Sequence, residues 1–71
     1  MNLQKMIDNC QNPRVHGKVM AYLRHSLNLQ GEDIAAILDV LEDGNAERFD
    51  KYENIVRESF ISAYNKAVIY L

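Results

Sequence analysis

The last third of the chain, residues 45–71, carries the longest regular pattern of apolar positions. Apolar residues recur at alternating spacings of three and four, which lays one stripe along a helix. The stripe consists of Phe49, Tyr52, Val56, Phe60, Ala63, Ala67 and Tyr70. Asn45 is a preferred N-cap residue, and no Gly or Pro follows it. The pattern therefore predicts one helix over residues 46–70, about 38 Å long at 1.5 Å per residue.

A second stripe joins the first near the end of this predicted helix. It comprises Ile61, Tyr64, Val68 and Leu71. The helix would thus be apolar around most of its circumference from Phe60 onward. Shorter neighbouring helices cannot cover its whole length, so we expect its apolar end to protrude and form an interface.

Two of the three upstream helices begin the chain. Residues 2–10 place four apolar side chains on one face of a short first helix: Leu3, Met6, Ile7 and Cys10. Asn12 as N-cap and Pro13 at the first helical position start a second helix, predicted over residues 13–29. Its inner face comprises Val15, Val19, Tyr22, Leu23, Ser26 and Leu27.

A third upstream helix is predicted over residues 32–43. We expect Gly31 to end the second helix in the left-handed conformation. Glu32 and Asp33 then place negative charge where the dipole of the third helix favours it. Its buried face comprises Ile34, Ile37, Leu38 and Leu41. Because no stretch alternates with a period of two, the predicted fold class is all-α.

The length of 71 residues predicts a single domain, residues 1–71, with a core of marginal size. The chain has one cysteine, which excludes an internal disulfide bond. Small domains without such cross-links often gain buried surface by oligomerising. We therefore predict a homodimer built on the last helix. The predicted interface residues are Phe60, Ala63, Tyr64, Ala67, Val68 and Leu71.

Charge is unevenly distributed along the chain. Residues 1–31 contain four basic residues and one acidic residue, a formal charge of +3. Residues 32–53 contain eight acidic and two basic residues, a formal charge of −6. This acidic segment is either a solvated face that keeps the protein soluble or a docking surface for a basic partner. The predicted partner-binding residues are Glu32, Asp33, Asp39, Glu42, Asp43, Glu47 and Asp50.

Candidate chemistry in the sequence is sparse. His16 and His25 are nine positions apart and point to opposite sides of a helix, so they cannot share a metal ion. Cys10 lies on an apolar face and is interpreted as a buried small hydrophobe. The acidic residues around Gly44 partly match a calcium-binding loop, but Leu41 occupies a position that requires an oxygen ligand. We expect no catalytic site, metal or cofactor, and the protein is predicted not to be an enzyme.

The stretch from Tyr22-Leu23-Arg24 to Asp33-Ile34-Ala35-Ala36-Ile37-Leu38 resembles the opening of a repressor-type helix-turn-helix. That resemblance implies a DNA-binding transcriptional regulator. In that alternative the basic second helix would contact DNA through Arg14, Lys18 and Arg24. The residues that follow depart from the pattern, because Glu42, Asp43 and Glu47 stand where a groove-facing helix carries polar and basic side chains. Phosphate would repel this segment.

The function predicted from sequence is therefore a small non-enzymatic regulator that binds another protein with a basic surface. In size and charge it is comparable to antirepressors, antitoxins and other phage- or plasmid-type regulators. DNA binding is the alternative. No apolar run approaches the roughly 18 residues of a membrane span, and the N-terminus lacks the apolar core of a signal peptide. The unpaired thiol also suits a reducing compartment, so the expected location is the cytoplasm.

Overall fold

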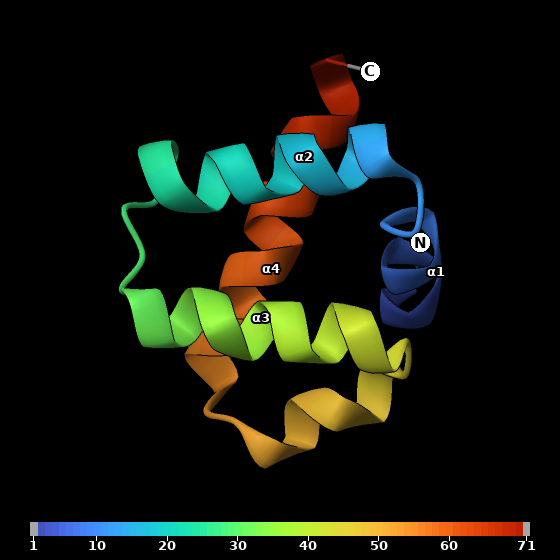
Figure 1. The fold of residues 1–71 in the computed structure, drawn as a ribbon, viewed down its shortest axis with the longest axis vertical. Coiled ribbons are helices and arrows are strands. Elements are labelled where there is room, and N and C mark those ends of the chain that lie inside the picture. The colour runs from blue at the N-terminus through green and yellow to red at the C-terminus, as the bar shows by residue number, and fades with distance from the viewer. Residues whose placement is uncertain (1, 71) are drawn as a thin grey trace.

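The computed structural model describes residues 2–70, and all regular structure in that range is helical, as predicted. In chain order the elements are α1 (Leu3–Asn9), α2 (Pro13–Ala21), the π-helix η1 (Tyr22–Ser26), α3 (Gly31–Asp43), the 3₁₀-helix η2 (Ala46–Lys51), α4 (Asn54–Ala67) and the 3₁₀-helix η3 (Val68–Tyr70). Figure 1 shows α4 crossing behind α2 and α3, with α1 beside them. Because α4 contacts every other element, it is the centre of the fold.

Three asparagines begin helices by accepting a hydrogen bond from the first turn. The Oδ1 atom of Asn12 accepts from the backbone N–H of Arg14 at 2.9 Å, and Pro13 follows at the first helical position, as predicted. Asn45 caps η2 in the same way, at 3.0 Å from the N–H of Glu47. Asn2 caps α1 through the N–H of Lys5.

The prediction of one continuous helix over residues 46–70 is wrong. Tyr52 and Glu53 are extended, with ψ angles of 167° and 154°, and they separate η2 from α4. The break allows the rings of Phe49 and Phe60 to pack at a centroid distance of 5.6 Å. Eleven positions along a continuous helix would hold the two residues roughly 16 Å apart. The whole chain measures only 30 Å along its longest axis, which a 38 Å helix would exceed.

The second helix also ends earlier than predicted. α2 ends at Ala21 and passes into η1, and the chain then turns at Asn28, which has a φ of +52°. Asparagine tolerates this left-handed conformation better than most residues with a side chain. Gly31 was expected to make that turn, but it is instead the first residue of α3. A left-handed glycine occurs instead at Gly44, which ends α3 with a φ of +80°.

The core lies where the inner faces of α1, α2 and α3 pack against α4. Its largest fully buried side chains are Phe49, Phe60, Ile7, Leu23, Ile37, Val19 and Val40. Six of these were predicted from the three-and-four spacing, whereas Val40 was not. Val40 lies three positions after Ile37, so the buried face of α3 is rotated toward it, and Ile34 and Leu38 are only half-buried. The burial of Cys10 is confirmed.

Glutamine side chains fix α1 against the turn between α3 and η2. The Nε2 atom of Gln4 donates to the carbonyl of Gly44 at 2.7 Å, and its Oε1 accepts from the N–H of Ala46 at 2.8 Å. Gln11 donates to the carbonyl of Leu41 at 3.2 Å. These bonds satisfy backbone groups at the end of one helix and the start of the next, where no helical partner exists. The acidic segment is thereby positioned from the N-terminal helix.

Candidate protein-binding surface

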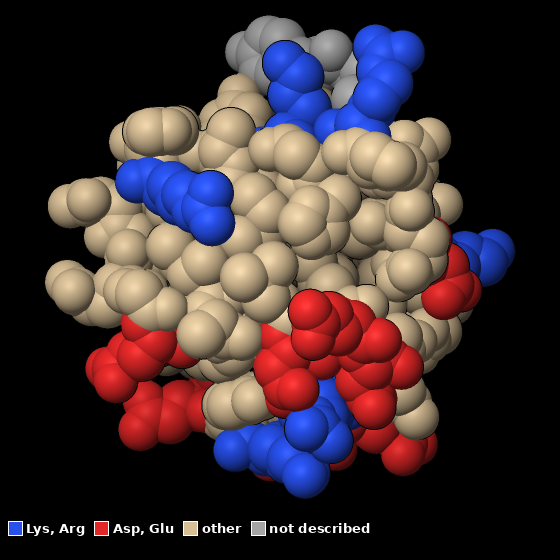
Figure 2. Space-filling model, viewed as in Figure 1, with Lys and Arg blue, Asp and Glu red and all other residues tan. Residues whose placement is uncertain are grey.

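The acidic residues gather at one end of the molecule. Figure 2 shows most of the Asp and Glu side chains of this face over the half that contains α3 and η2, with some basic side chains among them and others at the opposite end. The fold produces this separation because α2, with exposed Arg14 and Lys18, and α3, with five carboxylates and no basic residue, pack on different parts of α4. The segment that is acidic in sequence is therefore acidic in space.

Two of the seven predicted partner-binding residues are occupied by internal ion pairs. Asp39 accepts hydrogen bonds from Nε and Nη2 of Arg48 at 2.8 and 3.1 Å. Asp50 accepts from Nη2 of Arg57 at 2.6 Å. Arg48 lies within the acidic segment and Arg57 follows it. The two guanidinium groups neutralise part of the negative charge of that segment. The Asp39 pair thus joins α3 to η2, and the Asp50 pair joins η2 to α4. The spacing of these residues in the sequence did not reveal either ion pair.

The Asp39 carboxylate has a third partner in the hydroxyl of Tyr52, which donates to it at 2.5 Å. The Arg48 hydrogen bonds, followed by the Tyr52 hydrogen bond, lower the pKa of Asp39 below its ordinary value. The same contact raises the pKa of the Tyr52 hydroxyl, because it stabilises the protonated phenol. This cluster fixes the ring of Tyr52 at the bend between η2 and α4.

The other five predicted residues have no ion pair within the described part of the chain. Asp33 is half-buried at the first turn of α3, and the remaining four are exposed: Glu32, Glu42, Asp43 and Glu47. Glu53, which was not among the predicted partner-binding residues, is exposed at the N-cap of α4 and also lacks an ion pair. Its place in the same acidic segment was the available signal. These carboxylates are the charges that an external partner can reach.

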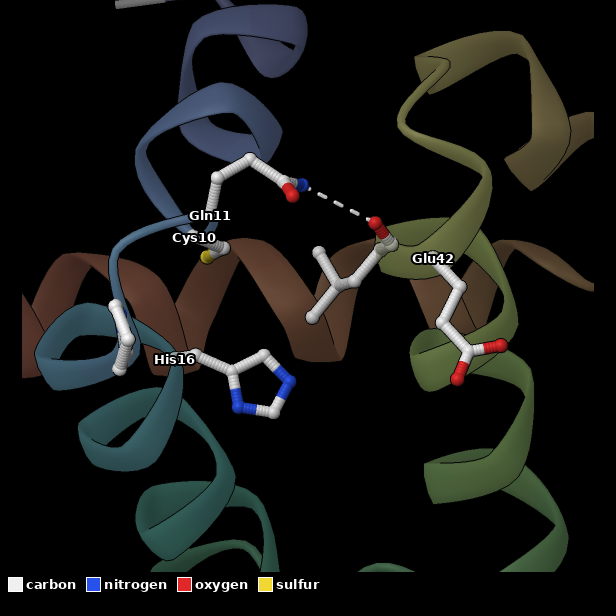
Figure 3. A pocket seen from close by; sticks show the side chains of 6 residues that line it. Cys10, Gln11, His16 and Glu42 are labelled. Atoms are coloured by element: carbon white, nitrogen blue, oxygen red, sulfur yellow. Dashed lines mark hydrogen bonds between the residues drawn. The ribbon is translucent and has the colours of Figure 1, made fainter.

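A hollow of about 320 Å³ lies between the α1–α2 connection and the end of α3. Figure 3 shows the ring of His16 and the carboxylate of Glu42 on opposite sides of it, with Gln11 bonded to the carbonyl of Leu41 above. Burial raises the pKa of the Cys10 thiol to about 11, so its nucleophilic thiolate is scarce near neutral pH. The residues that line this hollow can form hydrogen bonds, but Cys10 among them is not an activated nucleophile.

Metal ligands do not assemble in residues 2–70, where no three His, Cys, Asp or Glu side chains are grouped to bind one ion. His25 lies on the exposed side of η1, away from the hollow that contains His16. The residues that partly match a calcium-binding loop instead end α3 at Gly44 and begin η2 at Asn45. That stretch is therefore the end of one helix followed by the start of the next.

The residues predicted to form a dimer interface are mostly inside the single chain. Phe60, Ala63, Tyr64 and Ala67 are buried in its core. Within one chain, these four side chains are covered by the elements that pack around α4. Val68 is 38 % exposed, and Leu71 lies outside the described residues. The largest exposed apolar side chains elsewhere are Ile55 and Ile69.

Comparison with models of known protein families, with curated proteins and with solved structures finds no match to this chain. Within residues 2–70, no helix combines the length and apolar character needed to cross a membrane.

Proposed function

We propose that this protein is a non-enzymatic regulator that acts by binding a partner protein with a basic surface. The observation that supports the proposal is the acidic end formed by α3, η2 and the start of α4, whose carboxylates are largely without internal ion pairs. Complementary charge orients and accelerates the encounter of two proteins. Antirepressor-like action of a phage or plasmid type in the cytoplasm is the specific form that we propose.

Charge reversal tests this function. A tagged chain is used to capture proteins from the source cell, and each captured protein is identified by mass spectrometry. The triple variant Glu32→Lys, Glu42→Lys, Glu47→Lys should lose the partner, whereas Lys18→Glu with Arg24→Glu, at the opposite end, should retain it. The association rate of the purified partner should also fall by at least about tenfold between low and physiological salt. Loss of the partner only with the basic-end variants would refute the proposal.

DNA binding through α2 and η1 is the second candidate, because Arg14, Lys18 and Arg24 are exposed on these two elements. The second helix of a helix-turn-helix would be α3. Because its surface carries carboxylates that repel phosphate, the contacts with DNA would come from the basic residues that precede it. Fluorescence anisotropy with a random-sequence duplex separates the two functions. DNA binding that is lost in Lys18→Glu with Arg24→Glu would support this candidate.

Self-association remains part of the proposal, now through the exposed apolar residues at the end of α4. The exposed apolar residues Val68 and Ile69, 38 % and 75 % exposed, are adjacent at the end of α4. Covering such residues with a second chain removes apolar surface from water, which stabilises the association. Light scattering at micromolar concentration should give twice the chain mass if a homodimer forms, and a single-chain mass would refute it.

A further inference from the structure

A second hollow, of about 340 Å³, lies between the first turn of α3 and the bend that precedes α4. It is lined by Glu32, Asp33, Ala36, Tyr52, Glu53 and Val56. Both its apolar floor and its charged rim come from segments that are twenty residues apart in sequence. The bend at Tyr52 and Glu53, which interrupts the expected long helix, is what creates it.

The floor of this hollow is apolar and rigid. Ala36 and Val56 are 7 % and 4 % exposed, so their methyl groups form the floor while their backbones belong to α3 and α4. Tyr52 is half-buried, and its hydroxyl is bonded to Asp39, which Arg48 holds from the other side. The tyrosine ring is therefore positioned before any ligand arrives, which reduces the entropy cost of binding.

The rim carries three carboxylates, from Glu32, Asp33 and Glu53. None has an ion pair within the described residues, where Arg48 and Arg57 are paired with Asp39 and Asp50 instead. The N-termini of α3 and α4 adjoin the hollow and contribute roughly half a positive charge each. Three negative charges exceed that contribution, so the hollow favours a cation.

We propose that this hollow receives an arginine side chain of the partner protein. The methylene stem of an arginine would cover Ala36 and Val56, and the planar guanidinium would meet the Tyr52 ring and the rim carboxylates. A surface of acidic residues alone would accept any cation, but an apolar floor with an aromatic wall selects a long, weakly hydrated one. This inference rests on the proposed function and specifies where on the acidic end a basic partner is anchored.

Short peptides test the hollow without knowledge of the partner. Acetyl-Gly-Arg-Gly-amide is titrated into the ¹⁵N-labelled protein, and peptides with lysine or citrulline in place of arginine serve as comparisons. The arginine peptide should shift amide signals of residues 32–36 and 52–56 saturably. Citrulline, which has the same shape without charge, should bind at least about tenfold more weakly. Absence of saturable shifts, or equal binding of the lysine peptide, would overturn the proposal.

Matched variants distinguish the hollow from general attraction to the acidic end. Glu32→Gln with Glu53→Gln removes two charges from the rim, and Glu42→Gln with Glu47→Gln removes two exposed charges that do not line it. The rim pair should weaken the arginine peptide by at least about tenfold and the control pair by less than about twofold. Equal weakening by both pairs would overturn the hollow while leaving the acidic-end function intact.

Tyr52 provides a further comparison. Tyr52→Phe keeps the ring and loses the bond to Asp39, whereas Tyr52→Leu loses both, so weaker binding only in Tyr52→Leu would support a contact with the ring. Circular dichroism confirms that each variant is folded. If a captured partner ignores every acidic variant, the proposed function fails. If it responds to the triple acidic variant but not to Glu32→Gln with Glu53→Gln, only the arginine site fails.

Discussion

The guanidinium of Arg48 contacts both carboxylate oxygens of Asp39, with Nε 2.8 Å from Oδ2 and Nη2 3.1 Å from Oδ1. The two residues are nine positions apart and belong to η2 and α3. Two parallel hydrogen bonds between charged groups fix geometry as well as distance. This pair, together with the Tyr52 hydroxyl, determines how η2 folds back against α3 and where the bend before α4 lies.

The Asp39 pair predicts a specific dependence of stability on pH. Because the folded pKa of Asp39 is lowered by Arg48 and Tyr52, its stabilisation is present above the ordinary pKa of 3.8 and is lost as the pH falls through the folded value. Asp39→Asn should therefore reduce the difference in unfolding free energy between pH 7 and pH 2, measured by urea denaturation. Glu42→Gln, which removes an exposed carboxylate, is the control. An unchanged difference in Asp39→Asn would contradict this role.

Gln4 predicts a larger effect than a surface glutamine normally has. Its side chain bonds both the carbonyl of Gly44 and the N–H of Ala46, in the turn between α3 and η2. Gln4→Ala should lower the unfolding free energy by roughly 1–3 kcal/mol, because two partly buried backbone groups lose a partner. Gln11→Ala removes one such bond and should cost less. Equal stability of Gln4→Ala and the unaltered chain would show that water replaces both bonds.

Two glycines predict opposite effects of the same substitution. Gly17 is exposed inside α2, and a Cβ there meets no atom within 4 Å, so Gly17→Ala should raise the unfolding free energy by about 0.5–1 kcal/mol. Gly44 has a φ of +80°, so Gly44→Ala should lower it by about 1–2 kcal/mol. Thermal denaturation of the two variants gives the sign directly.

Local signals in the sequence predicted much of the fold. Asn12, Pro13 and Asn45 act within a few residues of themselves, and their capping roles were predicted correctly. The stripe from Phe49 to Ala67 faces the core of the single chain, even though the helix is broken at Tyr52. Its spacing was recognised from the sequence, but Phe60, Ala63 and Ala67 were predicted to form a dimer interface. Burial of these residues depends on the periodicity within each piece, and the bend reorients the pieces without changing which side is apolar.

The break itself could not be predicted, because its causes are tertiary. Tyr52 bonds Asp39 on α3, and the Phe49 ring meets Phe60 only after the chain has turned. Neither residue breaks a helix by its own preference. For the candidate site, the sequence located the acidic segment and nothing more. Spacing could not show that Asp39 and Asp50 form ion pairs, or that Glu53 lines one hollow together with Glu32 and Asp33.

The Cys10 thiol predicts a probe of unfolding. It is 3 % exposed and its pKa is raised from 9.0 to about 11 by burial, so it should react slowly with a thiol reagent near neutral pH and rapidly in urea. Because the folded pKa is the higher one, its contribution to stability is lost as the pH rises from about 9 to 11. Cys10→Ala should flatten this alkaline decline. Rapid labelling of the folded protein would contradict the burial.

The contrast between Phe60 and Val68 predicts which substitutions alter self-association and which alter folding. Phe60 is fully buried between Phe49 and Tyr64, so Phe60→Asp places a charge in the core and should unfold the chain at every protein concentration. Even Phe60→Ala should cost about 3–5 kcal/mol, a large share of the roughly 4–11 kcal/mol expected for this length.

Val68→Asp should instead leave the helical circular dichroism signal and the melting temperature at low concentration nearly unchanged, because Val68 is 38 % exposed at the end of α4. If chains associate through Val68 and Ile69, this variant should also abolish the dimer mass in light scattering, and the melting temperature of the unaltered chain alone should rise with concentration. Glu58→Gln, on the exposed side of α4, is the matched control and should keep the dimer. A folded Val68→Asp variant that still dimerises would move the interface away from the end of α4.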